Sequence, residues 1–184
     1  MFPASEWTSG AAFAAGFAAC AHRNQVRKYT GEPYINHCLE VAGLVCDLGG
    51  AYSPDMVKAA WLHDTIEDTD VTADEIYELF GRNVWRLVVG LTDSAPLSLG
   101  NRAQRKAYER DRLAAESSDV QTIKCCDLIS NTRSIVKHDP EFAKVYLVEK
   151  RNLLEVMTRA SGVARSHAFD VLKQAEEALN IGVK

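Results

Sequence analysis

Several features that mark special classes of protein are missing from this sequence of 184 residues. No apolar run is long enough to cross a bilayer, so we expect no membrane span. The formal net charge of −4 shows no basic excess, which argues against a long nucleic acid as partner but leaves room for a small anion at a local basic cluster. The apolar segment 10–21 has no basic stretch before it, so we interpret it as part of a core helix rather than a signal peptide, and we expect a cytoplasmic protein.

The cysteines also lack the pattern of a metal or disulfide framework. Their number is odd, no two are spaced as C-x-x-C, and each lies within an apolar, helix-like stretch. We therefore expect buried free thiols in a reducing compartment. The five are Cys20, Cys38, Cys46, Cys125 and Cys126.

Strand-like alternation, internal repeats and Pro/Gly-rich linkers are nearly absent as well, so we predict one domain over residues 1–184 and an all-α helical bundle. Helix starts are marked by Ser53-Pro54 and Asp139-Pro140, and residues 72–75 form a capping box. The pattern predicts helices at 6–22, 35–48, 54–68, 73–80, 82–91, 102–116, 119–134, 140–160 and 164–180. The stretch 90–102 is predicted to be a loop, which could connect two helices or cover a site.

The strongest chemical signal is the segment Leu62–Asp68, which reads LHDTIED. If the predicted helix continues through it, His63 and Glu67 share one face, as do Asp64 and Asp68. A helix C-terminus disfavours negative charge, so this cluster calls for a compensating cation. The alternative is a solvated acidic helix end without a metal.

Two more polar residues lie on apolar helical stripes. His37 follows the stripe of Tyr34 and Val41, where it is either a ligand or a core histidine bonded to a neighbouring backbone group. Asp127 lies on the face of Val120 and Ile123, where a carboxylate is either an ion-pair partner or a ligand.

The order of His37, then His63-Asp64, then Asp127 resembles the HD-domain metallophosphohydrolases. Residues 27–37, RKYTGEPYINH, resemble the opening motif of the RelA/SpoT-type alarmone hydrolases, and residues 63–68 resemble their HDxxED motif. Phe80-Gly81, residues 91–93 and residues 123–131 follow in matching order, so the likeness covers about residues 10–160. The chain looks like a stand-alone small alarmone hydrolase, without the synthetase and regulatory domains of the long members.

The resemblance implies a site with three kinds of residue. It implies that one divalent ion, commonly Mn²⁺ in that family, is bound by His37, His63, Asp64 and Asp127. It implies that Glu67 and Asp68 are the catalytic acidic pair. It implies that the nucleotide is bound by Arg27, Lys28 and Asn131, although for Arg27 and Lys28 a solvated basic turn is the alternative. Other basic residues along the chain are further candidates for binding phosphate, but most of them should be surface charges.

The implied reaction removes the 3′-diphosphate of (p)ppGpp or (p)ppApp as pyrophosphate. Two departures from the family pattern, Leu128 in place of a basic residue and Tyr29-Thr30 in place of a single residue, leave the base preference open. One alternative keeps the metal and changes the substrate, for example to a nucleoside monophosphate. Another is a catalytically silent alarmone-binding regulator. We expect a small nucleotide as the partner, with neither a nucleic acid polymer nor a membrane, and an oligomer is possible.

Overall fold

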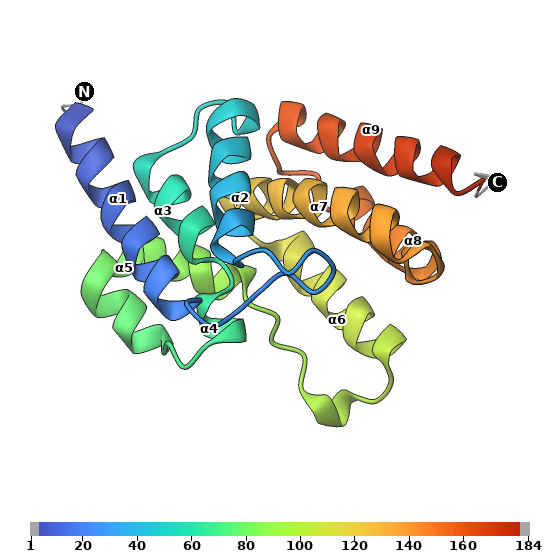
Figure 1. The fold of residues 1–184 in the computed structure, drawn as a ribbon, viewed down its shortest axis with the longest axis horizontal. Coiled ribbons are helices and arrows are strands. Elements are labelled where there is room, and N and C mark those ends of the chain that lie inside the picture. Colours follow the sequence, from blue (N-terminus) through green and yellow to red (C-terminus); the bar gives the residue numbers. More distant parts are fainter. Residues whose placement is uncertain (1–3, 181–184) are drawn as a thin grey trace. The chain divides into compact units, whose positions relative to one another are not determined.

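The computed structural model describes residues 4–180 and confirms the all-α prediction (Figure 1). Within these residues no strand forms, and an isolated antiparallel bridge pairs Val26 with Pro33. The helices are α1 (Ala4–Ala21), α2 (Ile35–Leu48), α3 (Pro54–Leu62), α4 (Thr65–Asp68), α5 (Ala73–Leu91), α6 (Arg102–Ala115), α7 (Ser118–His138), α8 (Pro140–Val156) and α9 (Gly162–Ala178), with the 3-10 turn η1 (Leu97–Leu99) in the predicted loop.

Local capping explains most of the helix starts. Ser53 accepts a hydrogen bond from the backbone N–H of Met56 at the start of α3. Thr72 and Glu75 form the predicted capping box of α5. Such caps satisfy backbone N–H groups that have no partner inside the helix, which is why these starts could be read from the sequence.

The prediction of one continuous helix over 54–68 is wrong. Helix α3 ends at Leu62 and α4 begins at Thr65, so His63 and Asp64 form a turn between two helices. The Thr65 hydroxyl donates to the Leu62 carbonyl at 2.7 Å and thereby satisfies a carbonyl that the broken helix leaves open. The i, i+4 face sharing proposed for this segment therefore does not apply.

The predicted break at Gly81 is present as a kink inside α5, where Gly81 has φ 81° and ψ 172°. A positive φ of this size is favourable only for glycine. At the other end of the chain, the last two helices do not meet where we predicted. Helix α8 ends at Val156 rather than at residue 160, and α9 begins at Gly162 rather than at residue 164, after the cap Ser161.

The chain divides into two compact units, residues 1–92 and 93–184, which we call the first and the second unit. In the first unit α3 packs against α1, α2 and α5, around a core that includes Val41, Val45, Leu62 and Val88. In the second unit α7, α8 and α9 pack against one another, and α6 packs against α8. The predicted organisation as a single domain stays a prediction.

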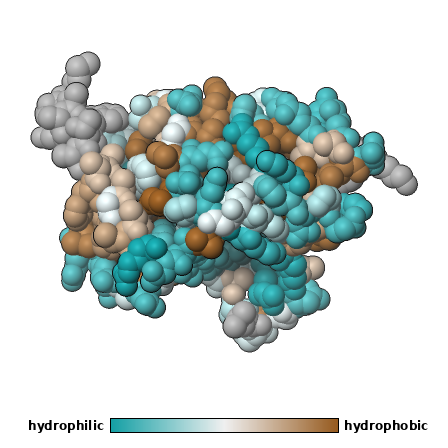
Figure 2. Space-filling view, in the orientation of Figure 1, coloured by the Kyte–Doolittle hydropathy of each residue, from teal (hydrophilic) through white to brown (hydrophobic). Residues whose placement is uncertain are grey.

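Surface properties bear on two further predictions. Figure 2 shows hydrophobic residues on the face in view as separate patches among hydrophilic ones. The expectation of buried thiols is wrong for Cys20 and Cys46, which are exposed, whereas the other three cysteines are buried. Among the described residues, no helix combines the length and the apolar character that a membrane span requires.

Candidate active site

Three of the predicted metal ligands converge in the first unit. His37 lies in the first turn of α2, and His63-Asp64 form the turn between α3 and α4. One ligand atom from each residue lies within 4.8 Å of the other two. Both imidazoles are 2% exposed, so the polar atoms of this cluster meet one another rather than water. These three residues can hold a divalent metal ion.

The hydrogen bonds fix which nitrogen of His63 faces the cluster. Its Nδ1 lies 2.9 Å from the carbonyl oxygen of Ala60, so Nδ1 carries the proton that this bond needs. In neutral His63 the Nε2 lone pair then points at the Asp64 carboxylate, 2.9 Å away, and at the Nε2 of His37, 3.2 Å away. Electron-pair donors facing one another are unfavourable unless a proton or a cation lies between them. A second nitrogen bonded to a backbone carbonyl is also the usual support for a metal-binding histidine.

Asp64 is the negatively charged member of the cluster. Burial alone raises its pKa, but protonated imidazoles at His63 and His37 would attract the carboxylate and donate hydrogen bonds to it, and these effects outweigh burial and hold the pKa well below its ordinary value. The Tyr34 hydroxyl also donates to Asp64 Oδ2 at 2.6 Å. Asp64 is therefore ionised and oriented, as a carboxylate ligand must be.

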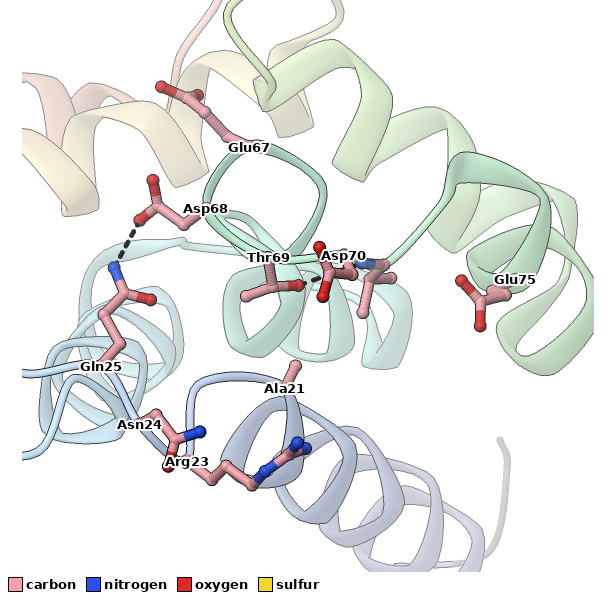
Figure 3. Close-up of a pocket in the computed structure, with 10 residues that line it drawn as sticks. Ala21, Arg23, Asn24, Gln25, Glu67, Asp68, Thr69, Asp70 and Glu75 are labelled. Atoms are coloured by element: carbon pink, nitrogen blue, oxygen red, sulfur yellow. Dashed lines mark hydrogen bonds between the residues drawn. The ribbon is translucent and has the colours of Figure 1, made fainter.

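The predicted catalytic pair lies on α4, directly after this turn. Glu67 and Asp68 are both exposed and line an open depression of about 670 Å³. Gln25 donates from Nε2 to Asp68 Oδ2 at 2.9 Å, whereas Glu67 points away from Gln25 (Figure 3). The Asp68 carboxylate is thus held in place by a residue that lies 43 positions earlier in the chain.

The depression itself is strongly acidic. Besides the catalytic pair it is lined by Asp70 and Glu75, and Arg23 is the cation that lines it. Four carboxylates against one guanidinium repel a polyanion. A phosphorylated nucleotide therefore needs its cations from other parts of the chain.

Arg27 and Lys28, predicted to bind the nucleotide, lie in a tight loop of the first unit. The backbone N–H of Arg27 donates to the Glu32 carbonyl at 2.8 Å, and Gly31 closes the loop with φ 70°. The guanidinium of Arg27 lies 6.0 Å from the centre of the Tyr34 ring. Lys28 is exposed, and its ammonium lies over the Tyr29 ring at 4.8 Å. Tyr29, one of the two residues that depart from the family pattern, thus contacts Lys28.

Asp127 and Asn131 belong to the second unit, on α7. Asp127 is 4% exposed and accepts hydrogen bonds from Asn131 Nδ2 at 2.5 Å and from Lys124 Nζ at 2.9 Å. The neighbouring Leu128 is buried in the core of this unit. Asp127 as the fourth metal ligand and Asn131 as a nucleotide contact stay predictions.

Sequence reasoning missed the residues that support the cluster. Tyr34 was assigned to an apolar stripe, but its hydroxyl bonds Asp64. His22 is buried, stacks on Tyr34 at 4.9 Å between ring centres, and bonds Gln25 through Nδ1 at 2.6 Å. Tyr34 and Asp64 are 30 residues apart in the sequence, so no local pattern reveals the bond between them.

Comparison with known proteins agrees with this arrangement. The family model described as HD domain matches residues 14–159. The guanosine-3′,5′-bis(diphosphate) 3′-pyrophosphohydrolase MESH1 of Danio rerio is 37% identical over 126 residues, which cover 68% of this chain and 68% of that protein. The Homo sapiens protein of the same name is 39% identical over 129 residues, which cover 70% of each chain.

A solved structure shares the fold. It is described as a metazoan ortholog of SpoT that hydrolyses ppGpp, and it superposes with a TM-score of 0.82 at 24% identity, over 95% of this chain and 97% of that one. At this identity the likeness concerns the fold alone. The family match and the two sequence relatives carry the assignment, and they confirm the resemblance noted in the motifs. The chain belongs to the HD domain family and is a relative of the MESH1 pyrophosphohydrolases.

Proposed function

We propose that this protein is a metal-dependent hydrolase that removes the 3′-diphosphate from (p)ppGpp, (p)ppApp or both. One observation carries the proposal: His37, His63 and Asp64 present three converging ligand atoms, and the acidic pair follows within four residues. The names of the sequence relatives, which specify a guanosine-3′,5′-bis(diphosphate) 3′-pyrophosphohydrolase, support the choice of substrate.

The donor set fits a divalent ion such as Mn²⁺, because imidazole and carboxylate together suit an ion of intermediate hardness. Asp127 is the proposed fourth ligand. When bound, such an ion acts as a Lewis acid that activates water and polarises a phosphoryl oxygen. Three or four protein ligands leave coordination positions open for water and substrate.

The acidic pair carries the proton transfers. Water attacks the phosphorus attached to the ribose 3′ oxygen, the bond between that phosphorus and the 3′ oxygen breaks, and pyrophosphate leaves. A carboxylate accepts the proton of the attacking water, and a proton is returned to the 3′ oxygen, which becomes a hydroxyl group. Asp68 accepts a hydrogen bond from Gln25 at 2.9 Å, which holds one carboxylate of the pair in place for these transfers.

The nucleotide is proposed to contact Arg27, Lys28 and Asn131. Arg27 can stack on a purine or bind phosphate through its planar guanidinium, and Lys28 can act as a point charge on phosphate. Guanine and adenine are not distinguished by any motif of this chain. The cytoplasmic location and an oligomeric state stay predictions.

A substrate panel tests the proposal. Purified protein with Mn²⁺ is mixed with ppGpp, ppApp, their pentaphosphate forms and a nucleoside monophosphate, and the released phosphates are quantified. We expect pyrophosphate from at least one alarmone. Orthophosphate from the monophosphate would identify a different hydrolase, and binding of alarmone without any release would identify a silent regulator.

A further inference from the structure

The second unit contains a cavity lined by lysines from three helices. Lys106 of α6, Lys124 of α7 and Lys150 of α8 all border it, and we call it the lysine cavity. Its volume is about 40 Å³. A volume of this size holds about one water molecule. A larger anion would therefore lie at its mouth, where the flexible lysine side chains can turn toward it.

The carboxylates that line the cavity already have cationic partners. Asp93 accepts a hydrogen bond from Lys106 Nζ at 2.8 Å. Glu149 accepts two bonds from the Arg102 guanidinium, both 2.8 Å long. Both carboxylates are thus bonded to cations other than Lys150.

A third carboxylate, that of Glu109, fixes the loop that forms one wall. It is 4% exposed and accepts the backbone N–H groups of Ser94 and Ala95 at 2.6 and 2.5 Å. It also accepts a hydrogen bond from Arg112 at 2.7 Å. Glu109 thereby anchors the loop next to Asp93, and its charge is satisfied by these donors.

Lys150 is left with no hydrogen bond and no ion pair to any residue between 4 and 180, although its side chain is only partly exposed. Its ammonium lies over the Tyr146 ring, 5.1 Å from the ring centre. Burial and then the positive charges of Lys124 and Lys106 lower the pKa of Lys150 to about 8, and two nearby carboxylates offset this only in part. A largely desolvated ammonium that no described carboxylate contacts directly is unfavourable, so an anion that came within hydrogen-bond distance of it would be bound.

The cavity also adjoins a predicted ligand. Lys124 borders the cavity and bonds Asp127 at 2.9 Å. An anion bound by Lys150 and Lys124 would therefore lie close to the carboxylate that is proposed to hold the metal. Phosphate is the anion that fits, because several ammonium groups can each donate to a different phosphate oxygen.

We propose that the lysine cavity is a phosphate subsite, in which Lys150 is the principal cation and binds one phosphate group of the nucleotide substrate. The identity of the anion rests on the proposed function, whereas the site itself rests on the geometry of the second unit. Lys150 is then a residue that sets substrate affinity.

The test compares K150M, which removes the charge but keeps the length, with K150R, which keeps the charge. K144M is the control, because Lys144 lies on the same helix, is half-exposed and pairs with Glu141 at 2.7 Å. Steady-state kinetics with ppGpp and ppApp should show KM raised about 10- to 100-fold in K150M, the size of a lost charge-assisted bond. We expect the kcat of K150M to stay within about threefold of the parent value, which corresponds to less than half of the free energy of a tenfold change. K150R and K144M should have a KM close to that of the parent protein.

A second measurement does not depend on turnover. Calorimetric titration of the metal-loaded protein with inorganic phosphate should give a Kd that K150M weakens about tenfold and K144M leaves unchanged. If the protein hydrolysed no alarmone but K150M still weakened phosphate binding, the proposed function would fail and the subsite would stand. Unchanged KM and unchanged phosphate affinity in K150M, or no phosphate binding by the parent protein, would overturn the subsite.

Discussion

Replacing Lys150 by methionine should stabilise the folded protein, although we expect it to weaken substrate binding. In the folded parent protein the pKa of Lys150 falls from the ordinary 10.5 to about 8. One pKa unit corresponds to about 1.4 kcal/mol, so keeping this ammonium charged costs the folded state roughly 3 kcal/mol. The stabilisation that removal of the charge brings is smaller than this cost, because the ammonium keeps part of its solvation and because its contact with the Tyr146 ring, worth about 0.5–1 kcal/mol, is lost. We expect K150M to be about 1–2 kcal/mol more stable at pH 7, which raises Tm by roughly 2–8 °C for a chain of this length.

The difference in stability between K150M and the parent protein should depend on pH. Below pH 8 the ammonium is charged in both the folded and the unfolded chain, so the full cost is present. Between pH 8 and 10.5 the folded state releases the proton before the unfolded state does, so the parent protein gains stability relative to K150M as the pH rises. The charged groups that act on Lys150 are Lys124, Lys106, Asp127 and Asp93, and they are the same in both proteins.

Thermal unfolding followed by circular dichroism at pH 7 and at pH 9.5 measures both effects. The difference in Tm between K150M and the parent protein should be positive at pH 7 and smaller at pH 9.5. K144M should show no comparable difference, because its ammonium is half-exposed and paired. A K150M protein that is less stable than its parent at pH 7 would refute the reasoning, since Lys150 would then be a structural residue rather than an uncompensated charge.

Three further predictions concern the metal cluster and the acidic pair. The double variant E67Q/D68N should retain its metal, measured by mass spectrometry, and lose about 10²- to 10⁴-fold in kcat; full activity would remove both residues from the mechanism. H63A should lose bound metal. Added Mn²⁺ should stabilise the parent protein by about 3 kcal/mol at one hundred times Kd and thereby raise its Tm, and H63A should lose this rise. Unchanged metal content would exclude His63 as a ligand. Q25L should lower kcat about tenfold while metal content stays constant, because Asp68 loses a charge-assisted bond; an unchanged kcat would show that Gln25 does not position Asp68.

Local signals in the sequence were sufficient for most of the helices. Caps such as Thr72 with Glu75 and the glycine at position 81 act within one turn of the chain, so their effect can be read without knowing the fold. The break at His63-Asp64 could not be read in this way, because no glycine or proline marks it. It depends on burial of His63 and on the Thr65 bond to Leu62, which form only when the helix is packed.

The site was predictable where a motif marked it and not where packing built it. His37, His63 and Asp64 were expected to meet, and the structure brings them together. Gln25 and Asp68 are 43 residues apart. Nothing in the sequence around either of them indicates the bond. The same holds for Glu109, a buried carboxylate inside a helix in which half of the residues are charged and which therefore looks solvent-exposed from its sequence.

Net charge was a poor guide to what this protein binds, because it averages over opposite local fields. The total of −4 shows no basic excess but leaves room for a local basic cluster, and the depression beside Glu67 and Asp68 is acidic. The subsite proposed for a phosphate group lies instead around Lys150, where every lining carboxylate already has a donor. An ammonium that lowers the stability of the folded chain is explained most simply by a ligand that supplies the missing negative charge.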